Sequence, residues 1–245
     1  MKRSSFWLVL VCILAATTVL VALGTWQVRR LAWKEALIAS VEARRQEAPI
    51  TLDGMVDQWQ RDQDVDYLPV TLSGEFDHAR EVFFYTTFGG KVGWDVLAPL
   101  VLADGRVAIV DRGFVPDALR DPKERGPGQI RGEVTVTGLA RNPQFDKPNS
   151  FVPDNRPDKR EFYWKDFAAI AQTMDLQRDD TLVPFIVDAG PSDIPGGFPR
   201  GGTTLIEFPN NHLQYAITWY GLALACVGVG GFFLFSRRRA AVGKN

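Results

Sequence analysis

The stretch Pro209–Tyr220, with the sequence PNNHLQYAITWY, separates a polar region of the chain from an apolar one. Proline cannot continue a preceding helix, and Asn211 and Gln214 have the spacing of a capping box. The stretch therefore predicts a helix that begins at His212. The segment Leu213–Phe235 carries no charged residue and is long enough to cross a bilayer. We expect His212 on the first turn of a membrane helix, at the boundary between water and lipid.

Two aromatic residues are predicted to share the helix face of His212. Tyr215 and Trp219 follow it by three and seven residues, which places all three side chains on one side of a helix. The positive end of the helix dipole favours the neutral imidazole, which is the form that binds a metal. The alternative is that His212 contacts only water or backbone, and that Tyr215 and Trp219 belong to an interfacial aromatic belt.

A second apolar segment lies near the N-terminus. Phe6–Leu23 contains 18 residues without a charge, and as a helix it would span about 27 Å. The alternative is a signal peptide, because residues 22–24 offer small side chains at the spacing of a cleavage site. We expect an uncleaved anchor, because the apolar segment is long and the following residues continue as a helix. No Arg- and Ser-rich transit peptide precedes the segment, which indicates a bacterial source.

Small residues indicate where the two apolar helices would meet. Thr18 and Ala22 in the first segment, and Gly221 and Ala225 in the second, have small-x-x-x-small spacing. Such spacing allows membrane helices to approach closely. We therefore expect direct packing through these four residues.

Positive charges beside the apolar segments predict the orientation of the chain. Six Lys or Arg residues lie on the side of the two termini, and four lie beside the intervening region. Positive residues favour the cytoplasm, and long domains translocate regardless of charge. We expect a multi-pass protein of the bacterial inner (plasma) membrane. Its predicted segments are a cytoplasmic N-terminus (1–5), transmembrane helix 1 (6–23), a juxtamembrane helix (24–48), a β-rich periplasmic domain (49–208), transmembrane helix 2 (212–235) and a basic cytoplasmic tail (236–245).

The predicted juxtamembrane helix carries a cationic and aromatic stripe. Trp26, Arg30 and Trp33 recur at helical spacing, with Arg29 at the flank of the stripe. These side chains suit an amphipathic anion such as the propionate edge of a haem. The alternative is an aromatic belt with arginines that extend toward lipid headgroups.

The region between the apolar segments has the composition of a β-rich domain. Its short runs of Val, Phe, Tyr and Thr are typical of strands, and Asp104-Gly105 is a strong hairpin signal. The predicted strands are 68–76, 81–88, 91–102, 106–115, 132–139, 182–189 and 204–207, with a helix at 163–174 and a solvated acidic loop at 57–66. Most neighbouring strands can pair antiparallel, so we expect an α+β domain with an antiparallel, open-barrel-like sheet.

Composition and motifs argue against several functional classes. The 245 residues are 46% hydrophobic with a net charge of −1, which does not indicate nucleic-acid binding. The two cysteines lie in the apolar segments, and the two histidines are too few for a multi-histidine metal site. The sequence contains no Cys-x-x-Cys, phosphate-loop, nucleophile-elbow or His-Glu-x-x-His motif. We interpret His78 as a turn histidine, and Asp111 with Arg112 as an ion pair at a strand end, so we expect no catalytic residue.

Five blocks of sequence, in order along nearly the whole chain, carry a family resemblance. They are LGTWQVRRLAWKEALI at 23–38, YLPVTLSGEFDHARE at 67–81, VDRGFVP at 110–116, FVPDNRP at 151–157 and IPGGFPRGGTTLIEFPNNHLQYAITWYG at 194–221. These blocks resemble the Surfeit locus protein 1 family, which comprises assembly factors of cytochrome c oxidase. Asp111 departs from the pattern, because Asn is common at that position of its block.

The resemblance implies a non-enzymatic factor that binds haem a and aids its insertion into subunit I of a haem-copper terminal oxidase of the respiratory chain. It implies His212 as the haem-iron ligand, and histidine is the commonest protein axial ligand of haem iron. The other candidate cofactor-binding residues are Tyr215, Trp219, Trp26, Arg29 and Arg30. The expected partners are subunit I, haem a synthase, other assembly factors and membrane lipid. The alternatives are a membrane scaffold that stabilises an oxidase assembly intermediate without haem and, less favoured, a periplasmic enzyme.

Overall fold

The computed structural model of the chain describes residues 3–176, 181–203 and 210–242, with side chains for 6–176, 181–203 and 210–237. The chain divides into two compact units. One comprises Met1–Ser40 together with Glu207–Asn245, and the other comprises Val41–Ile206.

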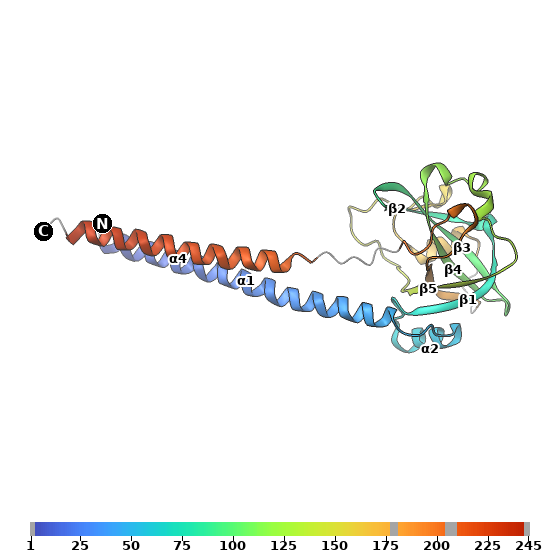
Figure 1. The fold of residues 1–245 in the computed structure, drawn as a ribbon, viewed down its shortest axis with the longest axis horizontal. Coiled ribbons are helices and arrows are strands. Elements are labelled where there is room, and N and C mark those ends of the chain that lie inside the picture. Colours follow the sequence, from blue (N-terminus) through green and yellow to red (C-terminus); the bar gives the residue numbers. More distant parts are fainter. Residues whose placement is uncertain (1–2, 177–180, 204–209, 243–245) are drawn as a thin grey trace. The chain divides into compact units, whose positions relative to one another are not determined.

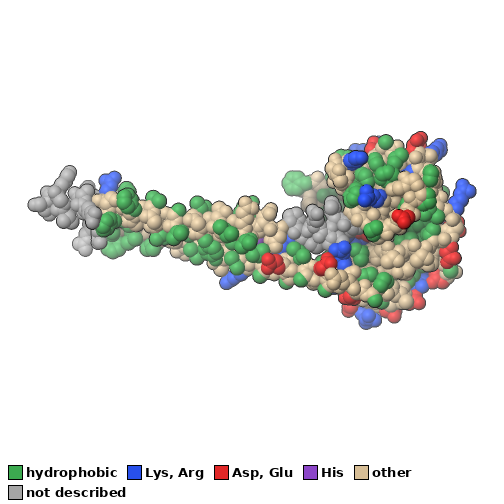
Figure 2. Space-filling view, in the orientation of Figure 1, with side chains coloured by type: hydrophobic (Ala, Val, Ile, Leu, Met, Phe, Trp, Pro, Cys, Tyr) green, Lys and Arg blue, Asp and Glu red, His purple; other side chains and the backbone are tan. Residues whose placement is uncertain are grey.

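The first unit is a pair of long helices, α1 (Arg3–Arg45) and α4 (His212–Val242), which lie side by side (Figure 1). Both helices are long and apolar enough to cross a membrane. Their outward side chains are large and apolar, as Leu14, Leu224 and Phe232 illustrate, and Figure 2 shows such side chains along the helices. Exposed apolar surface of this extent suits a lipid environment. These helices confirm the two predicted apolar helices, and α4 begins at the predicted residue.

The contact between the two helices differs from the predicted one. Ile13 lies beside Gly230, and Gly24 lies beside the ring of Tyr220, so the helices run antiparallel. A Cβ atom added at Gly24 would lie 2.9 Å from that ring, and one added at Gly230 would lie 2.6 Å from Ile13. Glycine at these positions therefore makes room for a large side chain of the neighbouring helix.

The small residues predicted to form the contact lie outside it. Thr18, Ala22, Gly221 and Ala225 are all exposed, so that prediction was wrong. The buried residues of α4 include Ala216 and Ala223, which are seven residues apart. A contact that repeats every seven residues follows the seam of an antiparallel coiled pair, and the four predicted residues lie beside this seam.

The second unit is built on a closed β-barrel. The strands are β1 (Pro69–Phe76), β2 (Val82–Phe88), β3 (Lys91–Leu102), β4 (Val107–Pro116), β5 (Glu133–Arg141), β6 (Glu161–Phe162) and β7 (Leu182–Ala189). Five of them follow the order β1-β5-β7-β4-β3, and β1 also pairs with β3, which closes the circle. β2 and β6 extend the sheet from β3. All strands predicted within the described residues are present, whereas the one at 204–207 lies outside them.

The predicted open, antiparallel sheet was wrong in two respects. First, β1 pairs with β3, and Gly74 on β1 allows the approach because a Cβ atom there would overlap the carbonyl oxygen of Val101. Second, β7 pairs parallel to β4, and β6 pairs parallel to β2, so the sheet is mixed. Parallel neighbours need long connections, and the chain between β4 and β7 supplies one.

Two helices cover the barrel. α2 (Leu52–Asp62) occupies part of the predicted acidic loop, so that prediction was wrong. Thr51 caps the helix, and Leu52 and Met55 enter the larger core beneath it. α3 (Phe167–Thr173) lies within the predicted helix 163–174 and contributes Ile170 to a second core cluster.

Candidate functional site at the start of α4

The first turn of α4 is supported by two asparagines. The side-chain oxygen of Asn210 accepts a hydrogen bond from the backbone N–H of His212 at 3.4 Å. The backbone carbonyl of Asn211 accepts one from Tyr215 at 3.2 Å. The helix thus starts as predicted, but the side-chain acceptor lies one residue before the predicted cap.

His212 is joined to α1 by a hydrogen bond that the sequence did not indicate. Its Nδ1 atom lies 2.7 Å from Oε1 of Gln27, and Gln27 is only 8% exposed. A carboxamide oxygen accepts hydrogen bonds and cannot donate them, so Nδ1 is the protonated nitrogen that donates. In the neutral imidazole, Nε2 then carries the lone pair. The bond leaves a potential metal ligand at the start of α4.

The helix phase defines two flanks of this contact. On α1, Gly24 lies about 60° to one side of Gln27, and Arg30 lies about 60° to the other. On α4, Tyr220 lies about 80° to one side of His212, and Tyr215 lies about 60° to the other. Tyr220 contacts Gly24, so in this antiparallel pair Tyr215 lies on the same flank as Arg30.

The flank that carries Arg30 also carries most of the other predicted site residues. Trp26 lies about 100° from Gln27 on this side and is 56% exposed, and Tyr215 is 54% exposed. The guanidinium of Arg30 lies 3.9 Å from the centre of the Trp33 ring, which is a cation–π contact. Trp219 is half-buried and lies close to the helix contact itself.

Arg29 is placed differently from Arg30. It is exposed and lies about 160° around α1 from Gln27. The helix therefore directs Arg29 away from α4. By helix phase, Trp26, Arg30 and Tyr215 lie on one flank of the contact between His212 and Gln27, Trp219 lies close to that contact, and Arg29 lies on the far side of α1.

The opposite flank is closed by Tyr220. Its ring lies against Gly24, and its hydroxyl lies 3.1 Å from Oγ1 of Thr25. This polar contact joins the two helices independently of His212.

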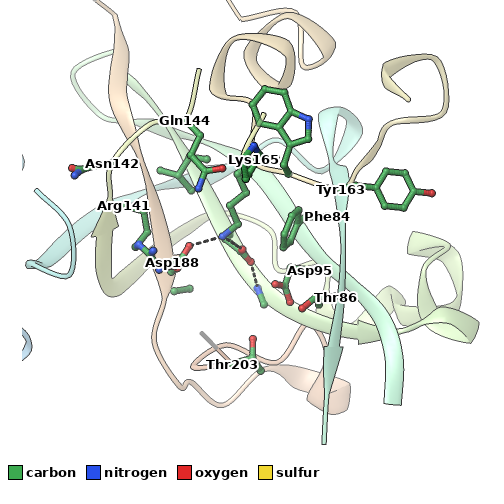
Figure 3. Close-up of a pocket in the computed structure, with 16 residues that line it drawn as sticks. Phe84, Thr86, Asp95, Arg141, Asn142, Gln144, Tyr163, Lys165, Asp188 and Thr203 are labelled. Atoms are coloured by element: carbon green, nitrogen blue, oxygen red, sulfur yellow. Dashed lines mark hydrogen bonds and ion pairs between the residues drawn. The ribbon is translucent and has the colours of Figure 1, made fainter. Parts of the chain in front are cut away.

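The barrel unit contains a separate polar cavity of about 350 Å³ (Figure 3). At its base, Nζ of Lys165 lies 2.8 Å from Oδ2 of Asp111 and 2.9 Å from Oδ1 of Asp188. Arg141 makes a further ion pair with Asp188 at 3.3 Å. Burial alone would lower the pKa of Lys165, but Asp111 and Asp188 raise it, so the ammonium stays charged.

Asp95 lines the same cavity. Within the described part of the chain, no hydrogen-bond partner lies against its buried Oδ1 atom. Burial, and after it the nearby Asp111 carboxylate, raise the pKa of Asp95 to about 8. Asp95 is therefore mainly protonated at neutral pH. No sequence motif marked this cluster, because its members come from separate strands and from the segment before α3.

The predicted ion pair between Asp111 and Arg112 does not form, so that prediction was wrong. Successive side chains of a strand point to opposite faces, and both residues lie within β4. Asp111 faces Lys165, whereas Arg112 pairs with Glu81 at 3.3 Å on the other face. Glu81 is buried and also pairs with Arg125 at 2.5 Å.

His78 belongs to this second charge network. It lies in a short turn between β1 and β2, as predicted. Its Nδ1 atom is 3.2 Å from Oε1 of Glu81, and its Nε2 atom is 2.8 Å from the carbonyl oxygen of Ile130. Both ring nitrogens are thus engaged with protein atoms, so His78 supports the fold of the barrel.

These features define a class of protein in which two long apolar helices are separated along the chain by a mixed β-barrel. The family model of the SURF1 family matches residues 14–224. The chain is 36% identical over 221 residues to Surfeit locus protein 1 of Homo sapiens, which covers 83% of this chain and 70% of the human protein. It is 35% identical over 224 residues to Surfeit locus protein 1 of Xenopus tropicalis, with 83% and 68% covered. It is also 34% identical over 240 residues to the SURF1-like protein of Monosiga brevicollis, with 93% and 87% covered.

The chain belongs to the SURF1 family, and the predicted resemblance is confirmed. Members of this family are known as cytochrome c oxidase assembly factors, which are not enzymes.

Proposed function

We propose that this protein is a membrane assembly factor for a haem-copper terminal oxidase. It binds haem a at the start of α4 and aids the insertion of this cargo into subunit I. Membership of the SURF1 family supports the role in oxidase assembly. The observation that carries haem binding is the hydrogen bond between Nδ1 of His212 and Gln27, which leaves Nε2 as the ligand atom.

The surrounding residues fit the cargo. His212 would bind the iron, and an imidazole nitrogen is a common axial ligand of haem. Trp26, Tyr215 and Trp219 supply aromatic surface for the macrocycle. Arg30, on the same flank, would pair with a propionate, and Arg29 would reach one only from the far side of α1. A haem at this position would keep its apolar edge beside lipid.

The proposed function also includes an orientation and a set of partners. Both termini lie in the cytoplasm and the barrel lies in the periplasm of a bacterial inner membrane, because the positive charges flank the termini. The direct partner is subunit I of the oxidase. Haem a synthase is the partner that would supply the cargo, and other assembly factors would act on the same intermediate.

The visible absorption spectrum of the purified protein tests this function. The full chain is produced in a host that synthesises haem a, together with His212→Ala and Gln214→Ala. Gln214 is exposed and lies about 160° from His212 around the helix, so it is a matched control. We expect bound haem a in the wild type and in Gln214→Ala. In His212→Ala the haem spectrum should be lost or shifted at normal membrane abundance, and oxidase activity should fall in the same strain.

Two outcomes would contradict the proposal in different ways. A wild-type spectrum in His212→Ala would exclude His212 as the ligand. Wild-type protein that carries no haem a but still co-purifies with subunit I would favour the scaffold function instead. His78→Ala is a second control, because both nitrogens of His78 already bond protein atoms in the barrel.

A further inference from the structure

Gln27 is a buried polar side chain in the contact between α1 and α4. It is 8% exposed, and the described contacts near it include the glycine–aromatic contact of Gly24 with Tyr220. A buried carboxamide costs free energy unless it forms hydrogen bonds. Among the residues that the structure describes, Gln27 has one such bond, to His212 at 2.7 Å. Because burying the Gln27 carboxamide costs free energy, its presence between the helices requires an explanation beyond packing.

The direction of the bond has a chemical consequence. Because the Gln27 oxygen accepts the proton of Nδ1, it selects one of the two neutral tautomers of the imidazole. The bond also fixes the plane of the ring. Histidines that bind metals usually donate their second ring N–H to such an acceptor, which orients the ring and increases the basicity of the ligating nitrogen.

We propose that Gln27 is a positioning residue that holds His212 with Nε2 directed to the haem iron. This inference rests on the proposed function, and it adds a residue of α1 to the site. It makes the site a product of both helices, because the ligand lies on α4 and its acceptor lies on α1. Separation of the helices would then release the ring of His212, and the affinity for haem would fall without any change at the ligand itself.

The test compares three variants of the full chain in detergent. Gln27→Met keeps the length of the side chain and removes the acceptor. Gln27→Glu keeps an acceptor at the same position. Thr25→Val is the matched control, because it removes a separate polar contact between the helices, that of Thr25 Oγ1 with the Tyr220 hydroxyl at 3.1 Å. Each variant is measured by ¹⁵N NMR of the His212 ring without haem, and by titration with isolated haem a.

The expected results separate positioning from packing. The wild-type ring should carry its proton on Nδ1, and Thr25→Val should preserve both this tautomer and the affinity. Gln27→Met should give a mixture of tautomers and bind haem a about 10- to 100-fold more weakly, which is the usual effect of losing such an acceptor. Gln27→Glu should restore most of the affinity.

Each contrary result identifies which proposal fails. A wild-type ring protonated on Nε2 would overturn the role of Gln27, because the carboxamide would then be a donor. Unchanged haem affinity in Gln27→Met, with affinity lost in His212→Ala, would overturn the positioning role and leave the proposed function intact. Wild-type protein that does not bind haem a would overturn both.

Discussion

The side chains of Gln27 and His212 meet at 2.7 Å although the two residues are 185 positions apart in the sequence. One lies on α1 and the other on the first turn of α4, so the site exists only while the two helices pack together. The barrel unit lies between these helices along the chain. The single chain therefore supplies both Gln27 and His212, one before the barrel unit and one after it.

Cysteine crosslinking tests the observed contact between the helices. In a background of Cys12→Ser and Cys226→Ser, the pair Ile13→Cys and Gly230→Cys should form a disulfide on oxidation, because these residues are adjacent. The pair Thr18→Cys and Gly221→Cys is the control. Both of its positions are exposed, so it should remain reduced. Crosslinking of the control pair alone would contradict the observed contact and restore the predicted one.

Reporter fusions test the orientation. The turn Asp104-Gly105 lies between β3 and β4 and carries exposed residues, so it tolerates a joined protein. A reporter enzyme that is active only in the periplasm should work when joined at Asp104 and fail when joined at Asn245. The reverse pattern would place the barrel in the cytoplasm.

Lys165→Met should strongly destabilise the barrel. The substitution leaves the buried carboxylates of Asp111 and Asp188 without the ammonium that lies 2.8 and 2.9 Å from them. Removing one partner of a buried ion pair costs about 3 to 5 kcal/mol. Lys147→Met is the control, because Lys147 pairs with the exposed Asp154, and such pairs contribute about 1 kcal/mol or less. Thermal unfolding of the two variants should therefore differ clearly, and equal melting temperatures would contradict the importance of the buried cluster.

Asp95→Asn should stabilise the barrel at alkaline pH. In the folded state the pKa of Asp95 is raised from 3.8 to about 8. Between these two values the folded state holds a proton that the unfolded state releases, so the free energy of unfolding falls as the pH rises. Asparagine cannot ionise, so the variant avoids this fall in the free energy of unfolding. We expect a gain of about 1 kcal/mol or more at pH 8, which for a domain of this size raises the melting temperature by about 2 to 4 °C. At pH 4 the two proteins should melt alike, and a larger gain at pH 4 than at pH 8 would contradict the raised pKa.

Local sequence patterns predicted the elements of this fold better than their assembly. The six predicted strands within the described residues are present, and the start of α4 was correct to the residue. These elements follow from side-chain alternation and capping, which act over a few residues. α2 was not predicted, because its acidic residues indicated a solvated loop. The apolar residues Leu52, Met55 and Trp59 nevertheless have helical spacing.

Closure of the barrel and the contact between the helices could not be predicted in the same way. Closure depends on the approach of Gly74 to Val101, and one glycine within a strand does not identify its neighbour. The residues proposed to bind haem were predicted from one face of each helix. Gln27 was missed, because its importance depends on how α4 is rotated against α1, which neither helix determines alone.

Arg30 and Arg29 should differ in their effect on haem, although the sequence treats them alike. Arg30 lies on the flank of Trp26 and Tyr215, whereas Arg29 lies about 160° around the helix from Gln27. Arg30→Gln should weaken retention of haem a by a few-fold, because exposed ion pairs contribute about 0.2 to 1 kcal/mol. Arg30→Lys should keep most of the retention, since the charge remains. Arg29→Gln is the matched control and should retain haem as the wild type does. A greater loss in Arg29→Gln than in Arg30→Gln would place the propionates on the opposite side of α1, and it would move the proposed site away from the flank shared by Tyr215 and Arg30.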